Sequence, residues 1–252
     1  MNRMTIYIMT LSRSAWLSTG FVVLLLAVFV PVFIAVAIPT GVQAQSKPGE
    51  VRIDDFKKTY KEGETYGQWD SRKISPLFGS GDTMFFQFVH TSDAEHYLHL
   101  KSGDDNSFSL GVEQEFEVAD TPILRWEWKV TKTPKGGDVR NEDKDDQAGS
   151  ICLIVDPGLT GFESLCYLWE NDGPKDTPIT SLKREDSRYL ILRTVKEDGK
   201  GMWLSESRNV LQDFKRVFGK APDEKAIIGI QIDSDSTESA AEVFYRNIYR
   251  SK

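Results

Sequence analysis

The residues best suited to direct chemistry are the carboxylates of the segment Asp233-Ser-Asp-Ser-Thr237. Asp233 and Asp235 stand two residues apart, with hydroxyl side chains beside them. Carboxylate oxygens in this arrangement suit a hard cation such as Ca²⁺, although the glycine and the distal glutamate of an EF-hand loop are missing. The alternative is a turn in which the aspartate and serine side chains accept hydrogen bonds from backbone N–H groups. The segment therefore predicts either a structural calcium site with Asp233 and Asp235 as ligands or a capped turn.

A second group of acids fills residues 138–146, which hold five carboxylates together with Arg140 and Lys144. Asp145 and Asp146 end this run, shortly before an apolar segment. A solvated loop between two strands is the simplest explanation of such a run. The alternative is that Asp145 and Asp146 reach a ligand or a cation at the rim of a sheet, where loops often carry function. We therefore take Asp146 as a candidate ligand-binding residue.

Three tryptophans form a further candidate site. Trp126 and Trp128 belong to Leu124-Arg-Trp-Glu-Trp-Lys-Val130, which alternates with period two, so both rings lie on one face of a strand. The opposite face carries Arg125, Glu127 and Lys129. Trp169 stands at the end of another apolar run, beside acidic and amide groups. Aromatic rings can stack on the apolar face of a sugar, but tryptophans in such strands also fill cores. Trp126, Trp128 and Trp169 are therefore candidates for ligand binding, with burial in the core as the alternative.

The sequence does not define a catalytic centre. Glycoside hydrolases need a pair of carboxylates and lyases a proton relay, and no spacing here singles out such a pair. If catalysis occurs, the acids Glu127, Asp146 and Asp233 are the candidates. The chain contains no G-x-S-x-G, C-x-x-C or H-E-x-x-H motif and no phosphate-binding glycine loop. These absences favour a binding protein over an enzyme.

Short apolar and alternating segments must position these residues. They are bounded by turn-forming residues and recur at intervals of about 8–15 residues, which is typical of β-sandwiches. The predicted strands are 51–56, 83–90, 95–101, 106–118, 123–130, 149–155, 164–170, 188–195, 202–205, 226–232 and 242–249. Only residues 209–218 have helical periodicity, with Asn209 as N-cap and Gly219 after the last turn. The sequence predicts an all-β, jelly-roll-like antiparallel β-sandwich with one short helix near 209–218.

The only two cysteines, Cys152 and Cys166, lie in neighbouring apolar runs separated by the turn-forming segment Asp156-Pro-Gly-Leu-Thr-Gly161. If the two runs form a hairpin, the cysteines lie opposite each other. A cross-strand disulfide is then permitted in an oxidising compartment. The alternative is two buried free thiols, which is common for cysteine.

The first 44 residues have the features of an export signal. Arg3 and Arg13 precede an apolar stretch at residues 21–38, and Val42-Gln-Ala44 provides small residues at a cleavage position. The apolar stretch is 18 residues long, close to the roughly 20 needed to span a bilayer. We therefore expect residues 1–44 to be a signal peptide or an N-terminal anchor. Residues 45–252 are expected to form a single β-sandwich domain that is periplasmic or extracellular, in contact with a membrane only through an uncleaved 21–38 segment.

The charge of the chain excludes one class of partner. Residues 45–252 contain 29 basic and 38 acidic residues, a net charge of −9. A nucleic-acid-binding protein needs a basic stripe to meet the phosphates, and none is visible. We therefore expect no nucleic-acid partner.

Several segments resemble an uncharacterised family of exported bacterial proteins, known as domain of unknown function 3047. The resemblance covers most of the chain after about residue 50. It is carried by the ordered segments 124–130, 145–148, 165–169, 208–210, 213–214, 218–219, 230–237 and 243–249. It implies a jelly-roll sandwich of the kind used by carbohydrate-binding modules, and no established activity. We therefore expect non-catalytic binding of a carbohydrate or a cell-envelope glycan. A glycoside hydrolase or polysaccharide lyase on the same scaffold and an envelope module that binds protein are the alternatives.

Overall fold

Residues Gln43–Lys252 form a compact unit that is separate from residues 1–42. A computed structural model of the protein describes residues 49–57, 69–70, 85–92, 95–103, 107–112, 114–155 and 161–252, all within this unit. The predicted signal peptide or anchor, residues 1–44, lies outside the described residues. Among the described residues, no helix is long and apolar enough to cross a bilayer.

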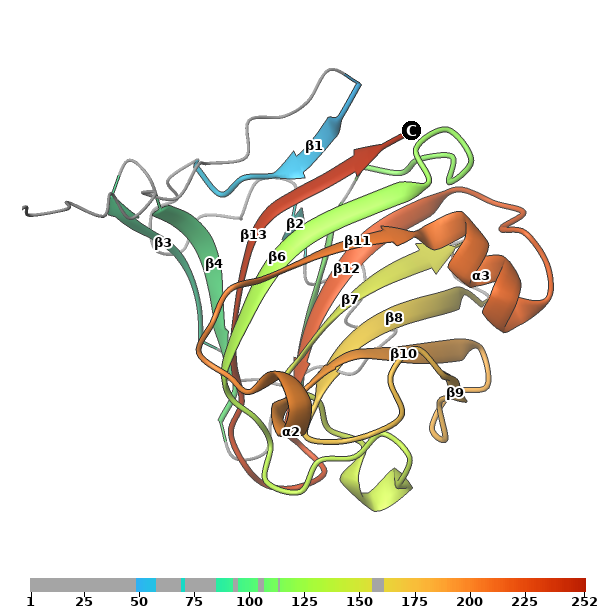
Figure 1. Ribbon diagram of the computed structural model, residues 1–252. Helices are drawn as coiled ribbons and strands as arrows, with labels where there is room; N and C mark the ends of the chain where they lie inside the picture. Colours follow the sequence, from blue (N-terminus) through green and yellow to red (C-terminus); the bar gives the residue numbers. More distant parts are fainter. Residues whose placement is uncertain are drawn as a thin grey trace, which may run out of the picture. The chain divides into compact units, whose positions relative to one another are not determined.

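The described unit is a β-sandwich of two sheets (Figure 1). The first is six-stranded, and β1 (Val51–Asp54) pairs with its β13. Its other strands are, in spatial order, β11 (Leu204–Asn209), β6 (Ile123–Lys132), β13 (Glu242–Ser251), β4 (Glu95–Lys101) and β3 (Phe85–Ser92). All pairings in this sheet are antiparallel. The two ends of the described chain thus meet in one sheet.

The second sheet is seven-stranded. Its strands are, in spatial order, β2 (Trp69–Asp70), β5 (Ser107–Val112), β12 (Ala226–Asp233), β7 (Gly149–Val155), β8 (Glu163–Glu170), β10 (Ser187–Thr194) and β9 (Pro178–Thr180). The predicted antiparallel sandwich is confirmed with one exception, because β8 and β10 pair in parallel. The chain between them includes β9, which pairs antiparallel with the other edge of β10.

Within the described ranges, three short helices connect strands: η1 (Glu142–Lys144), α2 (Val195–Asp198) and α3 (Val210–Phe218). The helix predicted near 209–218 is confirmed as α3. The Asn209 side chain accepts from the Gln212 N–H at its start, and Gly219 adopts a left-handed conformation at its end. The amphipathic face of α3 places Val210 and Phe214 in the core.

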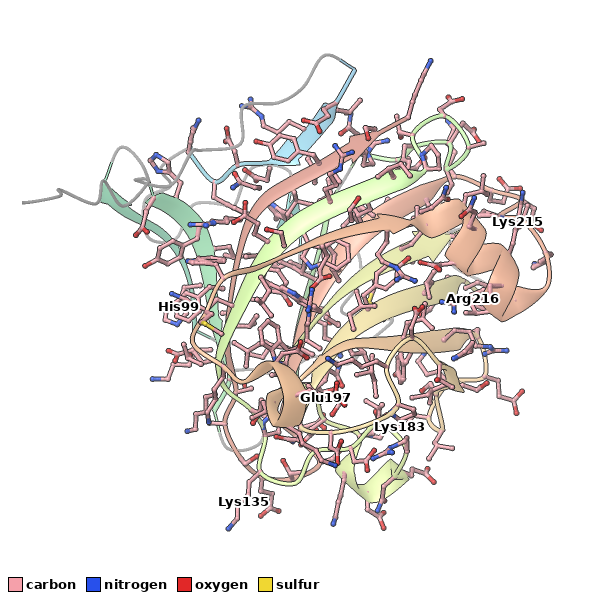
Figure 2. All side chains as sticks on the ribbon, viewed as in Figure 1. His99, Lys135, Lys183, Glu197, Lys215 and Arg216 are labelled. Atoms are coloured by element: carbon pink, nitrogen blue, oxygen red, sulfur yellow. A yellow bond between two sulfur atoms is a disulfide. The ribbon has the colours of Figure 1, made fainter. Side chains whose placement is uncertain are left out.

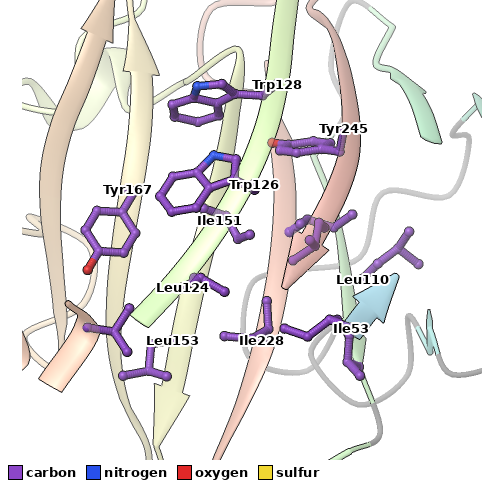
Figure 3. Packing of buried hydrophobic residues seen from close by; sticks show 14 of the residues in the cluster. Ile53, Leu110, Leu124, Trp126, Trp128, Ile151, Leu153, Tyr167, Ile228 and Tyr245 are labelled. Carbon is purple, nitrogen blue, oxygen red and sulfur yellow. The ribbon is translucent and has the colours of Figure 1, made fainter. Parts of the chain in front are cut away.

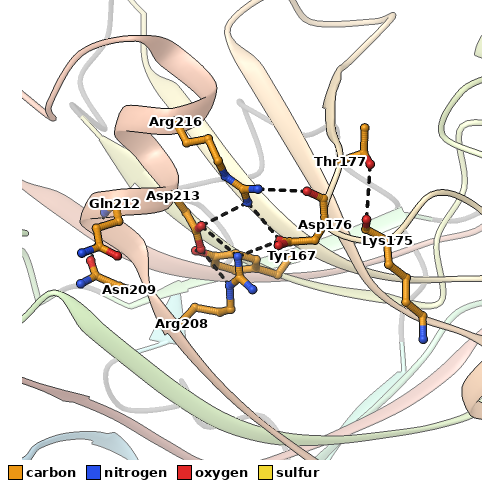
Figure 4. A network of polar contacts seen from close by, with 9 residues as sticks. All are labelled: Tyr167, Lys175, Asp176, Thr177, Arg208, Asn209, Gln212, Asp213 and Arg216. Carbon is orange, nitrogen blue, oxygen red and sulfur yellow. Dashed lines mark hydrogen bonds and ion pairs between the residues drawn. The ribbon is translucent and has the colours of Figure 1, made fainter.

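An ion-pair network fixes α3 to the sheets (Figure 4). Asp213 accepts a hydrogen bond from the buried hydroxyl of Tyr167 on β8, at 2.9 Å. Arg208 at the end of β11 donates to both oxygens of Asp213, each at 2.8 Å. Arg208 and Arg216 both contact Asp176. Burial is the main cause that raises the pKa of Tyr167 well above its ordinary value, and the charge of Asp213 adds to it.

The core lies between the two sheets (Figure 3). Trp126 on β6 faces Tyr167 on β8, and Trp128 faces Trp169; the ring centroids are 5.4 Å apart in both pairs. The Trp126 and Trp128 rings are arranged edge to face, with 5.6 Å between their centroids. Aromatic rings of this size contribute large buried areas, so this cluster is a main source of stability.

Cys152 and Cys166 form a disulfide across β7 and β8, with their Cα atoms 4.1 Å apart. The two residues are directly opposite in the antiparallel register of these strands. Of the two alternatives drawn from the sequence, a disulfide or two free thiols, the structure contains the disulfide. The bond lies on the face of the sheet that packs with Val139, Phe162 and Ile191 in a second, smaller apolar cluster.

Candidate functional site

The structure corrects the proposed role of the three tryptophans. Trp126 is 1% exposed, and Trp128 and Trp169 are 0% exposed. Their rings pack against one another between the sheets, with 5.4 Å between the centroids of Trp128 and Trp169. A sugar ring cannot reach them. The physical reason is the alternation of β6: Arg125, Glu127 and Lys129 share one face, which needs solvent, so the opposite face with the tryptophans turns inward.

The outward face of the six-stranded sheet carries a different set of aromatic residues. Tyr97 and His99 come from β4, Phe244 from β13, and Trp203 immediately precedes β11. All four side chains are partly exposed, and Figure 2 labels His99 on this face. Together with Lys129, Glu127, Glu242 and Arg246, we call these residues the aromatic face.

Register brings the rings of the aromatic face together. Phe244 pairs with His99 on one side and with Lys129 on the other. The Phe244 and His99 rings are stacked with 4.3 Å between centroids, and Tyr97 meets Phe244 edge-on at 5.5 Å. The centroids of Trp203 and Tyr97 are 5.9 Å apart. Four aromatic side chains from β4, β13 and the residue before β11 thus form one continuous patch.

Two cations pack against these rings. The Lys129 ammonium nitrogen is 4.3 Å from the centroid of Phe244 and 5.0 Å from that of Trp203. The Arg246 guanidinium carbon lies 4.1 Å from the Trp203 centroid. Such contacts contribute about 0.5–1 kcal/mol each at exposed sites, so they hold the rings in place without covering the patch with apolar side chains.

The acids of the aromatic face are already paired. Glu127 accepts from Arg246 Nε at 2.7 Å and from Asn247 Nδ2 at 2.9 Å. Glu242 contacts His99 Nε2 at 2.9 Å and also accepts from the Thr131 hydroxyl. Partial burial acts to raise the pKa of Glu242, but the hydrogen bonds from Thr131 and His99 outweigh it and hold the pKa below its ordinary value. The face therefore presents fixed, internally neutralised polar groups around its rings.

The second candidate site is an acidic rim at one end of the seven-stranded sheet. Asp233 ends β12, and Asp145 and Asp146 lie in the loop that leads into β7. Since Gln231 pairs with Ser150, these two segments meet at the same end of the sheet. One carboxylate oxygen from each of Asp146, Asp233 and Asp235 lies within 4.8 Å of the others. The structure thus brings together three residues that the sequence interpretation had placed in two separate candidate sites.

Hydrogen bonds fix the rim. Asp146 Oδ1 accepts from the Ser236 N–H at 3.0 Å, and Oδ2 accepts from the Thr237 N–H at 2.7 Å and from its hydroxyl at 2.5 Å. The Asp233 N–H donates to the Gln147 carbonyl at 3.1 Å. Backbone N–H groups of residues 233–237 are therefore capped, but mainly by Asp146, whereas the alternative drawn from the sequence assigned this role to the aspartates and serines of the segment itself.

One buried carboxylate oxygen beside the acidic rim has no hydrogen-bond donor among the described residues. Asp145 is 4% exposed, and its Oδ1 has no hydrogen-bond partner in the described part of the chain. Burial raises its pKa to about 6; the charge of Lys183 opposes this, and the charges of Asp146 and Asp235 add to it. Asp233 is 9% exposed. Burial, followed by the charges of Asp235 and Asp146, raises its pKa well above the ordinary value.

The three acids named for a hydrolase do not gather at one place. Glu127 lies on the outward face of the six-stranded sheet and is bound to Arg246. Asp146 and Asp233 lie at the end of the other sheet. Glu127 therefore cannot act as the partner of either aspartate across one sugar bond.

A family model described as "Protein of unknown function (DUF3047)" matches residues 80–249. The chain belongs to this family. The predicted resemblance is confirmed, and the matched residues include both the aromatic face and the acidic rim. No curated protein matches the sequence.

Solved structures similar to this member of the family are β-sandwiches. One is the family 11 carbohydrate-binding module of the cellulosomal cellulase Lic26A-Cel5E of Clostridium thermocellum. It has 11% sequence identity and a TM-score of 0.42, and the match covers 82% of this chain and 96% of that one. Another is the catalytic domain of Humicola grisea Cel12A, with 12% identity, a TM-score of 0.36, and coverage of 66% and 84%.

A third similar structure is the carbohydrate recognition domain of Emp46p in a metal-free form. It has 14% identity, a TM-score of 0.39, and coverage of 79% and 94%. Because identities and scores of this size do not define a shared site, no residue role is transferred from these proteins to this chain.

The sequence interpretation missed the aromatic face. Its signal was the alternation in residues 95–101 and 242–249, in which Tyr97, His99 and Phe244 fall opposite the apolar residues of their strands. Each strand alone offers only one or two outward rings. The patch exists because β4, β6 and β13 are neighbours, and the order of strands cannot be read from local periodicity.

Proposed function

We propose that this protein is an exported, non-catalytic β-sandwich that binds a neutral glycan on the aromatic face. The observation that carries the proposal is the partly exposed patch of Tyr97, His99, Trp203 and Phe244. Aromatic rings bind the apolar faces of sugar rings, and nearby fixed polar groups orient the hydroxyls. The patch offers both over three adjacent strands.

The charges of the aromatic face favour a neutral ligand. Glu127 and Glu242 balance Arg246 and Lys129 in formal charge. Glu127 is paired with Arg246, Glu242 interacts with His99 and Thr131, and Lys129 packs on the rings. An anionic polymer needs an excess of cations, whereas hydroxyl groups can share hydrogen bonds with pairs that already exist. We therefore expect uncharged oligosaccharides to bind more tightly than uronic-acid or phosphate-bearing ones.

Export is supported by two features. The leader at residues 1–44 has the charge and apolar pattern of a signal, and Cys152 and Cys166 are joined in a disulfide. Disulfides persist in oxidising compartments such as the periplasm and are rare in the cytosol. A glycan of the cell envelope or of the surroundings would be accessible there.

A glycan array followed by calorimetry tests the proposal. Wild-type protein should bind a neutral glycan, and Trp203→Ala and Tyr97→Ala should each weaken binding by about five- to tenfold, since stacking of one ring contributes about 1–1.4 kcal/mol. Leu182→Ala is the matched control, because Leu182 is an apolar residue with 53% exposure outside the aromatic face. It should leave the affinity unchanged.

Two results would contradict the proposal. Release of reducing ends from the bound glycan would show catalysis, and the non-catalytic assignment would be wrong. The absence of binding to every neutral glycan on the array would remove the glycan as ligand. In that case a protein partner of the envelope becomes the better explanation of the aromatic face.

A further inference from the structure

The geometry points to a divalent-cation site at the acidic rim, with carboxylate oxygens of Asp146, Asp233 and Asp235 as ligands of Ca²⁺. This inference does not depend on glycan binding, because the rim and the aromatic face use different residues. The site would join the loop that enters β7 to the loop that leaves β12.

The spacing of the oxygens fits the ion. Ca²⁺ binds oxygen atoms at about 2.3–2.6 Å, so two oxygens on one ion are at most about 5 Å apart. The three oxygens of the rim lie within 4.8 Å of one another. Carboxylates fixed at this spacing without a cation repel one another, and the repulsion is strongest where they are shielded from water.

Of the three carboxylates, Asp233 has the weakest hydrogen-bond donors around it. Asp233 is 9% exposed, and its oxygens accept only from Gln231 Nε2 at 3.3 Å and from the Asp235 N–H at 3.5 Å. Both contacts are at or beyond the long end of hydrogen-bond distances. Asp233 is thus a nearly buried carboxylate with weak partners, next to two further carboxylates.

A fourth acid provides independent evidence for a ligand. Asp145 directly precedes Asp146, it is 4% exposed, and its Oδ1 has no hydrogen-bond partner in the described part of the chain. A buried oxygen without a donor needs an explanation, such as an ion or a bound water. A water molecule on the cation would supply the missing donor to Asp145.

Lys183 alone does not balance this charge. Its ammonium group donates to the Ser236 hydroxyl at 2.8 Å and acts on both Asp145 and Asp233. Figure 2 shows Lys183 at the end of the sandwich where η1 lies. This lysine is exposed and carries one positive charge, whereas a divalent cation among the carboxylates of Asp146, Asp233 and Asp235 would carry two.

The backbone at the rim suits an ion that joins two loops. Asp146 already accepts from Ser236 and Thr237, which follow Asp235 directly. These contacts hold Asp146 against the 233–237 turn before any ion binds. A site whose ligands are held in this way loses little conformational freedom on binding, which favours affinity.

The test is thermal unfolding and calorimetry of the full chain, first stripped with EDTA and then titrated with Ca²⁺. Wild-type protein should bind one Ca²⁺ per chain. Its Tm should rise by about 5 °C or more once Ca²⁺ exceeds Kd about a hundredfold. Asp235→Asn and Asp233→Asn should each abolish or strongly reduce the rise. Asp235 is exposed, so its substitution should not prevent folding, which near-UV circular dichroism checks.

Asp143→Asn is the matched control. Asp143 is an exposed acid of the same loop as Asp146, and it is outside the rim. It should keep the full Tm rise. The proposal is overturned if wild-type protein shows neither heat of binding nor a Tm rise, or if Asp143→Asn reduces the response as strongly as Asp235→Asn. The second outcome would indicate general screening of negative charge rather than a site.

Discussion

At the scale of single residues, the aromatic face and the acidic rim differ in how their charges are satisfied. Each acid of the aromatic face has a partner, such as Arg246 for Glu127. The acidic rim and its surroundings contain buried carboxylate oxygens that have no hydrogen-bond partner in the described part of the chain. Glu170 at the end of β8 is 1% exposed, and its Oε1 has no partner within the described ranges. Burial, as the main cause, raises the pKa of Glu170 well above its ordinary value of 4.5.

This burial predicts that Glu170→Gln stabilises the protein at neutral pH. A carboxyl whose pKa is higher in the folded state favours folding only while it is protonated, so wild-type stability falls as the pH rises above about 4.5. Glutamine cannot ionise, so the variant should gain about 1 kcal/mol or more at pH 7 and nothing near pH 4. Urea unfolding at several pH values measures the difference. Identical curves for both proteins at every pH would show that Glu170 is ionised at no cost.

At the scale of elements, α3 is attached through Asp213, which is 8% exposed and bound to both Tyr167 and Arg208. Removing one partner of such a pair leaves the others unpaired in a poorly solvated place. Asp213→Ala should therefore lower the free energy of unfolding by about 2–4 kcal/mol. Asp176→Ala is the control: Asp176 is half exposed and contacts the same arginines, and its loss should cost less than about 1 kcal/mol. Equal losses in the two variants would contradict this account of the network.

Some of the elements could be predicted from the sequence and others could not. Helix α3 was predictable because its periodicity, Asn209 and Gly219 are all local features. The opposition of Cys152 and Cys166 followed from the symmetry of one hairpin. The parallel pairing of β8 with β10 and the meeting of Asp146 with Asp233 were not predictable, because each depends on the spatial order of strands distant in sequence. The alternation of β6 places its tryptophans opposite the charged face, but only the position of the second sheet shows that they fill the core rather than line an open concave surface.

At the scale of the whole domain, the disulfide closes a short loop between two central strands. Cys152 and Cys166 are separated by 14 positions, and a loop of this length is worth about 3 kcal/mol in the chain-entropy model. The Cys152→Ser, Cys166→Ser double variant should therefore unfold about 6–12 °C lower than the oxidised wild type. Adding a reductant should lower the Tm of wild-type protein toward that of the variant. A Tm that is equal in the two oxidised proteins would show that the bond contributes nothing.

The central claim is that a neutral glycan binds on the aromatic face, and the tryptophans allow a direct measurement of it. Of the five tryptophans among the described residues, only Trp203 is not buried. In protein labelled with ¹⁵N-tryptophan, titration with the glycan that binds best on the array should shift the indole N–H signal of Trp203. That signal is identified by its loss in Trp203→Phe. The signals of the buried tryptophans should move little. Saturable binding that leaves the Trp203 signal in place, or shifts only the buried ones, would contradict the account.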